Sequence, residues 1–133
     1  MRKSFLLILI AFILCVAVML IDNRPLYMSI TMDEAAGIME VQEDYALVDV
    51  RTELEFNEKH IPGAMNIPNE SIISDNIKEL PDKDQLILVY CRSGNRSKQA
   101  AQKLGEFGYS NVYEIGGILD WNGLTVSSKD EEK

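Results

Sequence analysis

One short run of this sequence combines the residue types that could carry chemistry. Cys91 ends an apolar segment, Gly94 permits a sharp turn after it, and Arg92 and Arg96 add positive charge. Backbone N–H groups in such a turn can point inward, and the start of the next helix adds its dipole. Each effect favours a thiolate, so the pKa of Cys91 is expected below the usual value of about 8.5. The run predicts a reactive nucleophile in an anion-binding loop.

The cysteine count leaves Cys91 without a partner in the folded part of the chain. The only other cysteine, Cys15, lies inside an apolar block near the amino terminus. A disulfide framework and a zinc site with several thiolates are therefore excluded. Composition alone would favour a buried, inert cysteine, but the glycine and arginines around Cys91 favour a reactive one.

The spacing of this run separates two kinds of cysteine chemistry. Cysteine phosphatases use a C-x5-R loop, which is wide enough for a tetrahedral phosphate. Here four residues separate Cys91 from Arg96, and this smaller loop suits a terminal sulfur better. An aspartate that could protonate a leaving alcohol is not identifiable in the sequence. The spacing favours sulfur transfer, with a phosphatase or an arsenate reductase of similar fold as the less favoured alternative.

Short apolar runs alternate with helical patterns along the chain, which is typical of an α/β domain with a mainly parallel sheet. The strongest strand, Gln85 to Tyr90, ends directly on Cys91, and ligands bind at the carboxyl ends of such strands. Capping-box patterns at Thr31 and Thr52 predict two helix starts. The expected strands are 26–30, 46–50, 64–67, 85–90 and 112–115; the expected helices are 32–41, 53–59, 71–80, 97–107 and 118–121; the expected turns are 60–63, 81–84 and 116–117.

The amino terminus differs from the rest of the chain. Residues 5–21 are uncharged and apolar, and Arg2 and Lys3 precede them. The length suits a membrane anchor better than a cleaved signal, and no A-x-A cleavage pattern follows, so both remain open with the anchor favoured. The basic start predicts that the following domain lies on the extracytoplasmic side, or is exported if the signal is cleaved. We expect a signal-anchor or signal peptide at 1–24, a folded domain at 25–124 and a charged, disordered tail at 125–133.

The domain after the apolar block is strongly acidic. Two of the 13 basic residues precede the block, which leaves 11 basic and 21 acidic residues after it and a net charge of −10. This charge argues against nucleic acid and against docking on an anionic membrane surface. Any site for a small anion must therefore be built locally.

Three separated stretches resemble the rhodanese-like (rhodanese homology) domains. The first runs from Asp49-Val50-Arg51 through Glu55-Phe56 to His60-Ile61-Pro62-Gly63-Ala64-Met65-Asn66-Ile67-Pro68. The second is Val89-Tyr90-Cys91-Arg92-Ser93-Gly94-Asn95-Arg96-Ser97, and the third is Gly116-Gly117 with Trp121. Each piece is weak alone, but their order and spacing over about Ile30 to Gly123 make a strong match. One departure is Lys59, where family members often have glycine, and little consequence is expected from it.

The resemblance implies a central five-stranded parallel sheet flanked by helices and a double-displacement sulfurtransferase. Cys91 would take a sulfane sulfur from an anionic donor such as thiosulfate and pass it to cyanide or a thiol. The implied chain is a monomer that needs neither metal nor cofactor; the alternative is a non-catalytic module that relays a persulfide. The expected substrate-binding residues are Arg92, Ser93, Gly94, Asn95, Arg96, Ser97 and Arg51.

Three other polar or aromatic residues are expected to be structural. His60 is the only histidine, and the Pro-Gly pair after it favours a hydrogen bond that fixes the turn over a role as catalytic base. Asp49, at a strand end, is expected to bond to loop amides or to Arg51. Trp121 is expected to pack in the core or at its rim.

Overall fold

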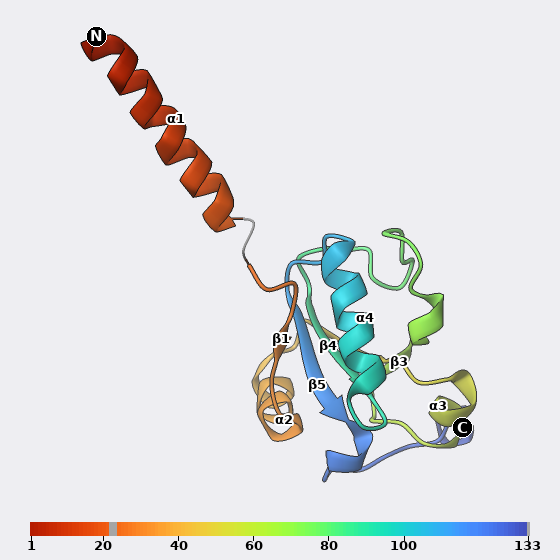
Figure 1. Cartoon of the computed structure of the whole chain (residues 1–133). Helices are drawn as coiled ribbons and strands as arrows, with labels where there is room; N and C mark the ends of the chain where they lie inside the picture. The colour runs from red at the N-terminus through yellow and green to blue at the C-terminus, as the bar shows by residue number, and fades with distance from the viewer. Residues whose placement is uncertain (22–23, 133) are drawn as a thin grey trace.

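Five short strands form one parallel sheet in the order β1-β5-β4-β2-β3 (Figure 1). The computed structural model describes residues 1–21 and 24–132; residues 22, 23 and 133, which the predicted segments 1–24 and 125–133 include, lie outside the described residues. Helices flank this sheet, which confirms the predicted fold. The strands are β1 (Met28–Ser29), β2 (Tyr45–Asp49), β3 (Met65–Asn66), β4 (Leu86–Cys91) and β5 (Val112–Gly117).

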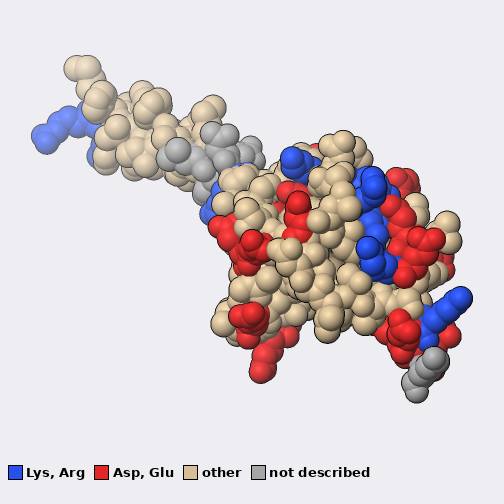
Figure 2. Space-filling model, turned by 90° about the horizontal axis from the view of Figure 1, so that it is seen from below, with Lys and Arg blue, Asp and Glu red and all other residues tan. Residues whose placement is uncertain are grey.

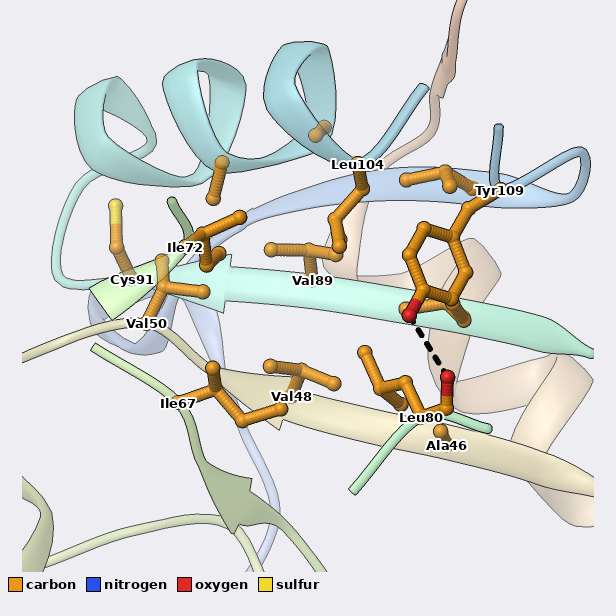
Figure 3. Packing of buried hydrophobic residues seen from close by; sticks show 14 residues of the cluster. Ala46, Val48, Val50, Ile67, Ile72, Leu80, Val89, Cys91, Leu104 and Tyr109 are labelled. Carbon is orange, nitrogen blue, oxygen red and sulfur yellow. Dashed lines mark hydrogen bonds between the residues drawn. The ribbon is translucent and has the colours of Figure 1, made fainter. Parts of the chain in front are cut away.

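Alternation along the central strand assigns its side chains to two cores. Ile87, Val89 and Cys91 belong to the cluster that packs against α4 (Asn95–Glu106). Figure 3 shows Val89 and Cys91 within this cluster. Leu88 and Tyr90 belong to the cluster that packs against α2 (Met32–Val41). Because successive side chains of a strand point to opposite faces, the strand period places the Cys91 side chain on the α4 face.

Two helices begin as the sequence predicts. Thr31 caps α2 and Thr52 caps α3 (Glu53–Glu58), and each cap forms a complete capping box with the glutamate three residues later. The reciprocal hydrogen bonds satisfy backbone donors that a helix start otherwise leaves free. Local sequence therefore suffices to predict these two boundaries.

The prediction of a helix over residues 71–80 is wrong. Only a 3-10 turn, η1 (Asn69–Ser71), forms there, and the chain then runs irregularly to Leu80. Of this stretch only Ile72 and Leu80 are buried hydrophobic anchors, so no continuous apolar face holds a helix against the core. The Lys83 ammonium group donates to the Asp75 backbone carbonyl and so further fixes the irregular path.

The last strand runs further than predicted. The sequence predicts a strand that ends at Ile115, followed by a turn, but β5 continues through Gly117. Val89 pairs with Glu114 and Cys91 with Gly117, so two steps along β4 match three along β5. The extra residue makes a β-bulge, in which Gly116 has a φ of +90°. The turn η2 (Ile118–Asp120) follows the bulge.

The charged tail, which was expected to be disordered, contains the short helix α5 (Ser128–Glu131). His60 and Val126 exchange two backbone hydrogen bonds just before it. A capping box between Ser127 and Asp130 starts the helix, and α5 lies beside α3 (Figure 1). The tertiary pairing with His60 therefore orders a segment whose composition indicates disorder.

The apolar amino-terminal block forms a single helix, α1 (Arg2–Ile21), outside the α/β body (Figure 1). Its window Arg2–Met19 has a mean hydropathy of 2.3, and none of it is buried. By length and composition α1 is able to cross a membrane, and a signal sequence has the same properties.

Candidate active site

Cys91 is the last residue of β4 and lies at the carboxyl end of the sheet, where α/β proteins bind ligands. The loop after it turns at Gly94, which has a φ of +108°, a conformation that glycine adopts without strain. Helix α4 begins at Asn95, two residues before the predicted start, so only three residues separate strand from helix. The tight connection holds the Cys91 side chain, which is 1% exposed, beneath the loop.

Hydrogen bonds converge on the Cys91 sulfur. The Gly94 N–H donates to Sγ at 3.0 Å, and the Ser97 Oγ lies 3.5 Å from the same atom. Burial by itself raises the pKa of the Cys91 thiol. Hydrogen bonds from the Ser97 hydroxyl and from the N–H groups of Ser97, Gly94 and Ser93 outweigh this effect and lower the pKa of Cys91 below its ordinary value. The direction of this shift agrees with the expectation from sequence.

Arg96 does not stand free beside the loop. Its guanidinium makes a two-pronged ion pair with Glu55 of α3, with Nη1–Oε2 at 2.7 Å and Nη2–Oε1 at 2.9 Å. The hydrogen bonds from Arg96 are the main reason that the pKa of Glu55 falls to about 2. Sequence reasoning assigned Glu55 to a helix cap and missed its contact with the active loop, because the two segments lie 41 residues apart.

The remaining loop residues divide into an exposed rim and a buried base. Arg92, Ser93 and Asn95 are exposed, whereas Gly94 and Ser97 are buried. The Arg92 carbonyl accepts a hydrogen bond from the N–H of Leu119 at 3.3 Å, which ties the rim to η2. Seen from below, basic side chains gather in a narrow strip beside acidic ones (Figure 2). Positive charge is thus local on an acidic protein.

The guanidinium of Arg51, a residue expected to bind substrate, is buried and is bound by groups within the fold. Arg51 is 5% exposed, and its Nη2 lies 2.7 Å from Asp49 Oδ2 and 2.6 Å from the carbonyl oxygen of Lys59. Arg51 follows a buried strand, so a partner for its charge had to be buried with it. The structural role expected for Asp49 is confirmed.

His60 and Trp121 are structural, as predicted. The His60 ring is fully buried, is stacked on Phe56 at 3.7 Å, and has Nδ1 2.7 Å from the Phe56 carbonyl oxygen. Its Nε2 lies 3.2 Å from Glu131 of α5. The half-buried Trp121 packs against the core on the α2 face, and its indole N–H donates to the Leu124 carbonyl.

A buried glutamate lies under the loop and was missed by the sequence analysis. Glu114 of β5 is 3% exposed, and its Oε1 accepts from the Ser97 hydroxyl at 2.7 Å. A Cβ placed on Gly94 would lie 3.8 Å from that oxygen, so the carboxylate is directly adjacent to the turn. The available signal was a charged residue inside an otherwise apolar strand.

A cysteine with a lowered pKa, held among N–H donors, can act as a nucleophile toward an electrophilic sulfur and can keep the resulting anion solvated by amides. In residues 1–21 and 24–132, no group of three or more His, Cys, Asp or Glu side chains is placed to hold a metal ion. The geometry is that of a cysteine-based transferase site at the end of a parallel strand.

The comparison with known families agrees with this geometry. The family model described as "Rhodanese-like domain" matches residues 31–124, and the chain therefore belongs to the rhodanese-like domain family. Its relatives are sulfurtransferases, which establishes the general class of activity as sulfur transfer between a donor and an acceptor.

Two curated relatives and two solved structures illustrate the similarity. The thiosulfate sulfurtransferase PspE of Escherichia coli is 37% identical over 73 residues, which are 55% of this chain and 70% of PspE. A sulfurtransferase of Allochromatium vinosum is 42% identical over 87 residues, which are 63% of this chain and 79% of the relative. A rhodanese with anions from E. coli superposes with a TM-score of 0.59 at 33% identity and covers 63% of this chain and 99% of its own. The Alr3790 protein from Anabaena gives a TM-score of 0.68 at 27% identity, and the match covers 76% of this chain and 82% of the Alr3790 chain.

Proposed function

We propose that this chain is a thiosulfate sulfurtransferase that works through a persulfide on Cys91. The observation that carries the proposal is the Gly94 N–H at 3.0 Å from Sγ, in a loop whose hydrogen bonds lower the pKa of the thiol. A relative named thiosulfate sulfurtransferase supports thiosulfate as the donor. The reaction requires a thiolate, and the loop stabilises one.

In the first half-reaction the Cys91 thiolate attacks the outer sulfur of thiosulfate. A new S–S bond forms at Sγ, the S–S bond of thiosulfate breaks, and sulfite leaves with the bonding pair. The terminal sulfur then carries the negative charge, and the loop amides from Arg92 to Ser97 would donate to it; the Gly94 N–H, which donates to Sγ, supports this role. In the second half-reaction, cyanide or a thiolate attacks the terminal sulfur and Cys91 leaves as the thiolate.

The proposed donor-binding residues lie on the rim of the loop. Arg92 is exposed beside Cys91, and Ser93 and Asn95 are exposed next to it. Arg96 contributes its charge after an anion has competed with Glu55 for the guanidinium. Arg51 is omitted from this set because Asp49 and the Lys59 carbonyl already bind its guanidinium.

The test uses the full chain in detergent with thiosulfate and cyanide, and separately with a phosphate ester. The proposal expects thiocyanate formation that disappears in Cys91→Ser and persists in Cys15→Ser. Loading by thiosulfate alone should add about 32 Da, one sulfur atom, to Cys91. Loading without thiocyanate formation would indicate a module that relays a persulfide to a partner. Activity on the ester alone would contradict the proposal and favour a phosphatase or an arsenate reductase.

We further propose that α1 is an uncleaved anchor, that the domain lies on the extracytoplasmic side, and that the protein is a monomer. Arg2 and Lys3 precede the apolar helix, which supports a cytoplasmic amino terminus. The expected result is retention in membranes after alkaline extraction, with protease access to the domain from outside the cell. N-terminal sequencing that begins after α1 would contradict the anchor, and sedimentation in detergent tests the oligomeric state.

A further inference from the structure

Glu114 is a buried carboxylate whose partners are neutral donors. Its Oε1 accepts from the Ser97 hydroxyl at 2.7 Å and from the Gly116 N–H at 2.8 Å, and its Oε2 accepts from the Ser29 hydroxyl at 3.3 Å. Among the described residues no Lys, Arg or His forms an ion pair with it. Burial of a carboxylate without a cation is costly. The position of Glu114 beneath the active loop suggests a role in the reaction.

Ser97 connects Glu114 to the nucleophile. The Ser97 hydroxyl has one proton, and its closest acceptor is Glu114 Oε1, ahead of the Gly94 carbonyl at 2.9 Å. With its proton directed to Glu114, Ser97 presents a lone pair to Cys91, whose Sγ lies 3.5 Å away. In this arrangement the thiol donates to Ser97 and Ser97 donates to Glu114. Once Cys91 ionises, Sγ and Glu114 Oε1 compete for the same Ser97 proton, so Ser97 stabilises the thiolate only in part.

The unloaded thiolate and the persulfide place their negative charge on different atoms. In the thiolate the charge is on Sγ, the atom next to Ser97. In the persulfide it is on the outer sulfur, about 2 Å further along the S–S bond. A hydrogen bond from Ser97 to Sγ therefore stabilises the thiolate more than it stabilises the persulfide. An acceptor that competes for the Ser97 proton weakens this hydrogen bond and so disfavours the thiolate relative to the persulfide.

We propose that Glu114 is a positioning residue that withholds the Ser97 hydroxyl from Cys91 and thereby favours the persulfide over the unloaded thiolate. The inference rests on the persulfide chemistry proposed above and deepens it. A thiolate with one hydrogen bond fewer is also a stronger nucleophile toward the donor. The loading step itself is unchanged: the Sγ–S bond forms, the thiosulfate S–S bond breaks, and sulfite leaves with the electron pair.

The other charged groups around the site are the Arg96–Glu55 ion pair and Arg92. Arg96 of α4 interacts with the charge of Cys91 and is bound to Glu55 of α3, and Arg92 is exposed on the rim. Replacement of Glu114 by glutamine leaves these groups in place. Its effects therefore do not arise from a change in these groups.

The first experiment compares Glu114→Gln with the wild type and with Ser29→Ala, which removes the contact to the other carboxylate oxygen. A neutral amide oxygen competes less well for the Ser97 proton than a carboxylate. The pH of half-maximal alkylation of Cys91 by iodoacetamide should therefore fall by about 0.7 unit in Glu114→Gln. The ratio of persulfide to thiolate at fixed thiosulfate and sulfite should fall about fivefold. Ser29→Ala should match the wild type in both measurements.

The second experiment tests whether Ser97 transmits the effect. In a Ser97→Ala background, Glu114→Gln should shift neither measurement, because the shared proton is absent. If Glu114→Gln shifts the measurements equally in the wild-type and Ser97→Ala backgrounds, the charge of Glu114 acts through space and the inference is overturned. A pH of half-maximal alkylation that is unchanged or raised in Glu114→Gln would also overturn it.

A third variant protects the test against misfolding. Glu114→Asp keeps the charge but is too short to reach Ser97 from the same backbone, so it should behave like Glu114→Gln; wild-type behaviour would overturn the inference. A wild type that forms no thiocyanate would refute the proposed function. The pH profiles of alkylation would still be interpretable, because alkylation needs no sulfur donor.

Discussion

The ion pair between Glu55 and Arg96 allows a precise test, because Glu55→Gln removes its charge and keeps its other role. Glu55 also receives hydrogen bonds from the N–H and hydroxyl of Thr52 in the capping box. Glutamine can replace glutamate at this position of a capping box, because its side-chain oxygen accepts the same hydrogen bonds. The substitution therefore isolates the ion pair from the start of α3.

The expected loss of stability follows from the pKa of Glu55, which falls from 4.5 to about 2, mainly through the hydrogen bonds from Arg96 and with a smaller contribution from Thr52. Taken in full, this change corresponds to about 3 kcal/mol of folding free energy at neutral pH. The two side chains are 30% and 29% exposed, and solvent screening reduces the expected contribution to about 1–2 kcal/mol. Urea denaturation at pH 7 should show this loss in Glu55→Gln.

The pH dependence has a defined sign. The pKa of Glu55 is lowered on folding, so its contribution is complete above the ordinary value of 4.5 and is lost as the pH falls toward about 2. The difference in the free energy of unfolding between wild type and Glu55→Gln should therefore shrink between these two values. A difference that stays constant down to pH 2 would refute this account of the pair.

Glu55→Gln, which should weaken the fold, should strengthen the binding of an anionic donor. In the wild type an anionic donor must compete with Glu55 for Arg96. Removal of the Glu55 charge should therefore lower the KM for thiosulfate about three- to tenfold. The matched control is Glu53→Gln, which removes one negative charge from the same exposed helix. An equal fall in KM in both variants would mean that net charge, and not the release of Arg96, controls binding.

Three further substitutions test the parts that position the site. Arg51→Met leaves Asp49 buried without its partner and should destabilise the fold by about 3–5 kcal/mol, measured by urea denaturation; a loss below 1 kcal/mol, about the value of an exposed pair, would contradict this. Gly117→Ala places a Cβ against the carbonyl of Arg92 and should lower thiocyanate formation at least about tenfold by moving the loop; an unchanged rate would show that the contact is not needed. Tyr109→Phe removes a 2.7 Å hydrogen bond to a buried carbonyl (Figure 3) and should lower the thermal stability by about 1 kcal/mol, with activity retained.

Local signals were sufficient for several elements. Each capping box needs only a threonine and the glutamate three residues later, so the starts of α2 and α3 were predictable from short segments. The apolar run that ends on Cys91 predicted the central strand. The helix over 71–80 failed because that segment has the length of a helix but no continuous apolar face.

The sequence by itself determined that Cys91 lies at the end of a buried strand and precedes a glycine turn, since backbone geometry and strand period depend on neighbouring residues. Only the tertiary structure decided which groups surround it. Glu55 meets Arg96, and Glu114 lies under the loop, only because parallel strands and their bulge bring distant segments to one edge of the sheet. Electrostatic interactions act through space, and the folded chain alone defines those distances.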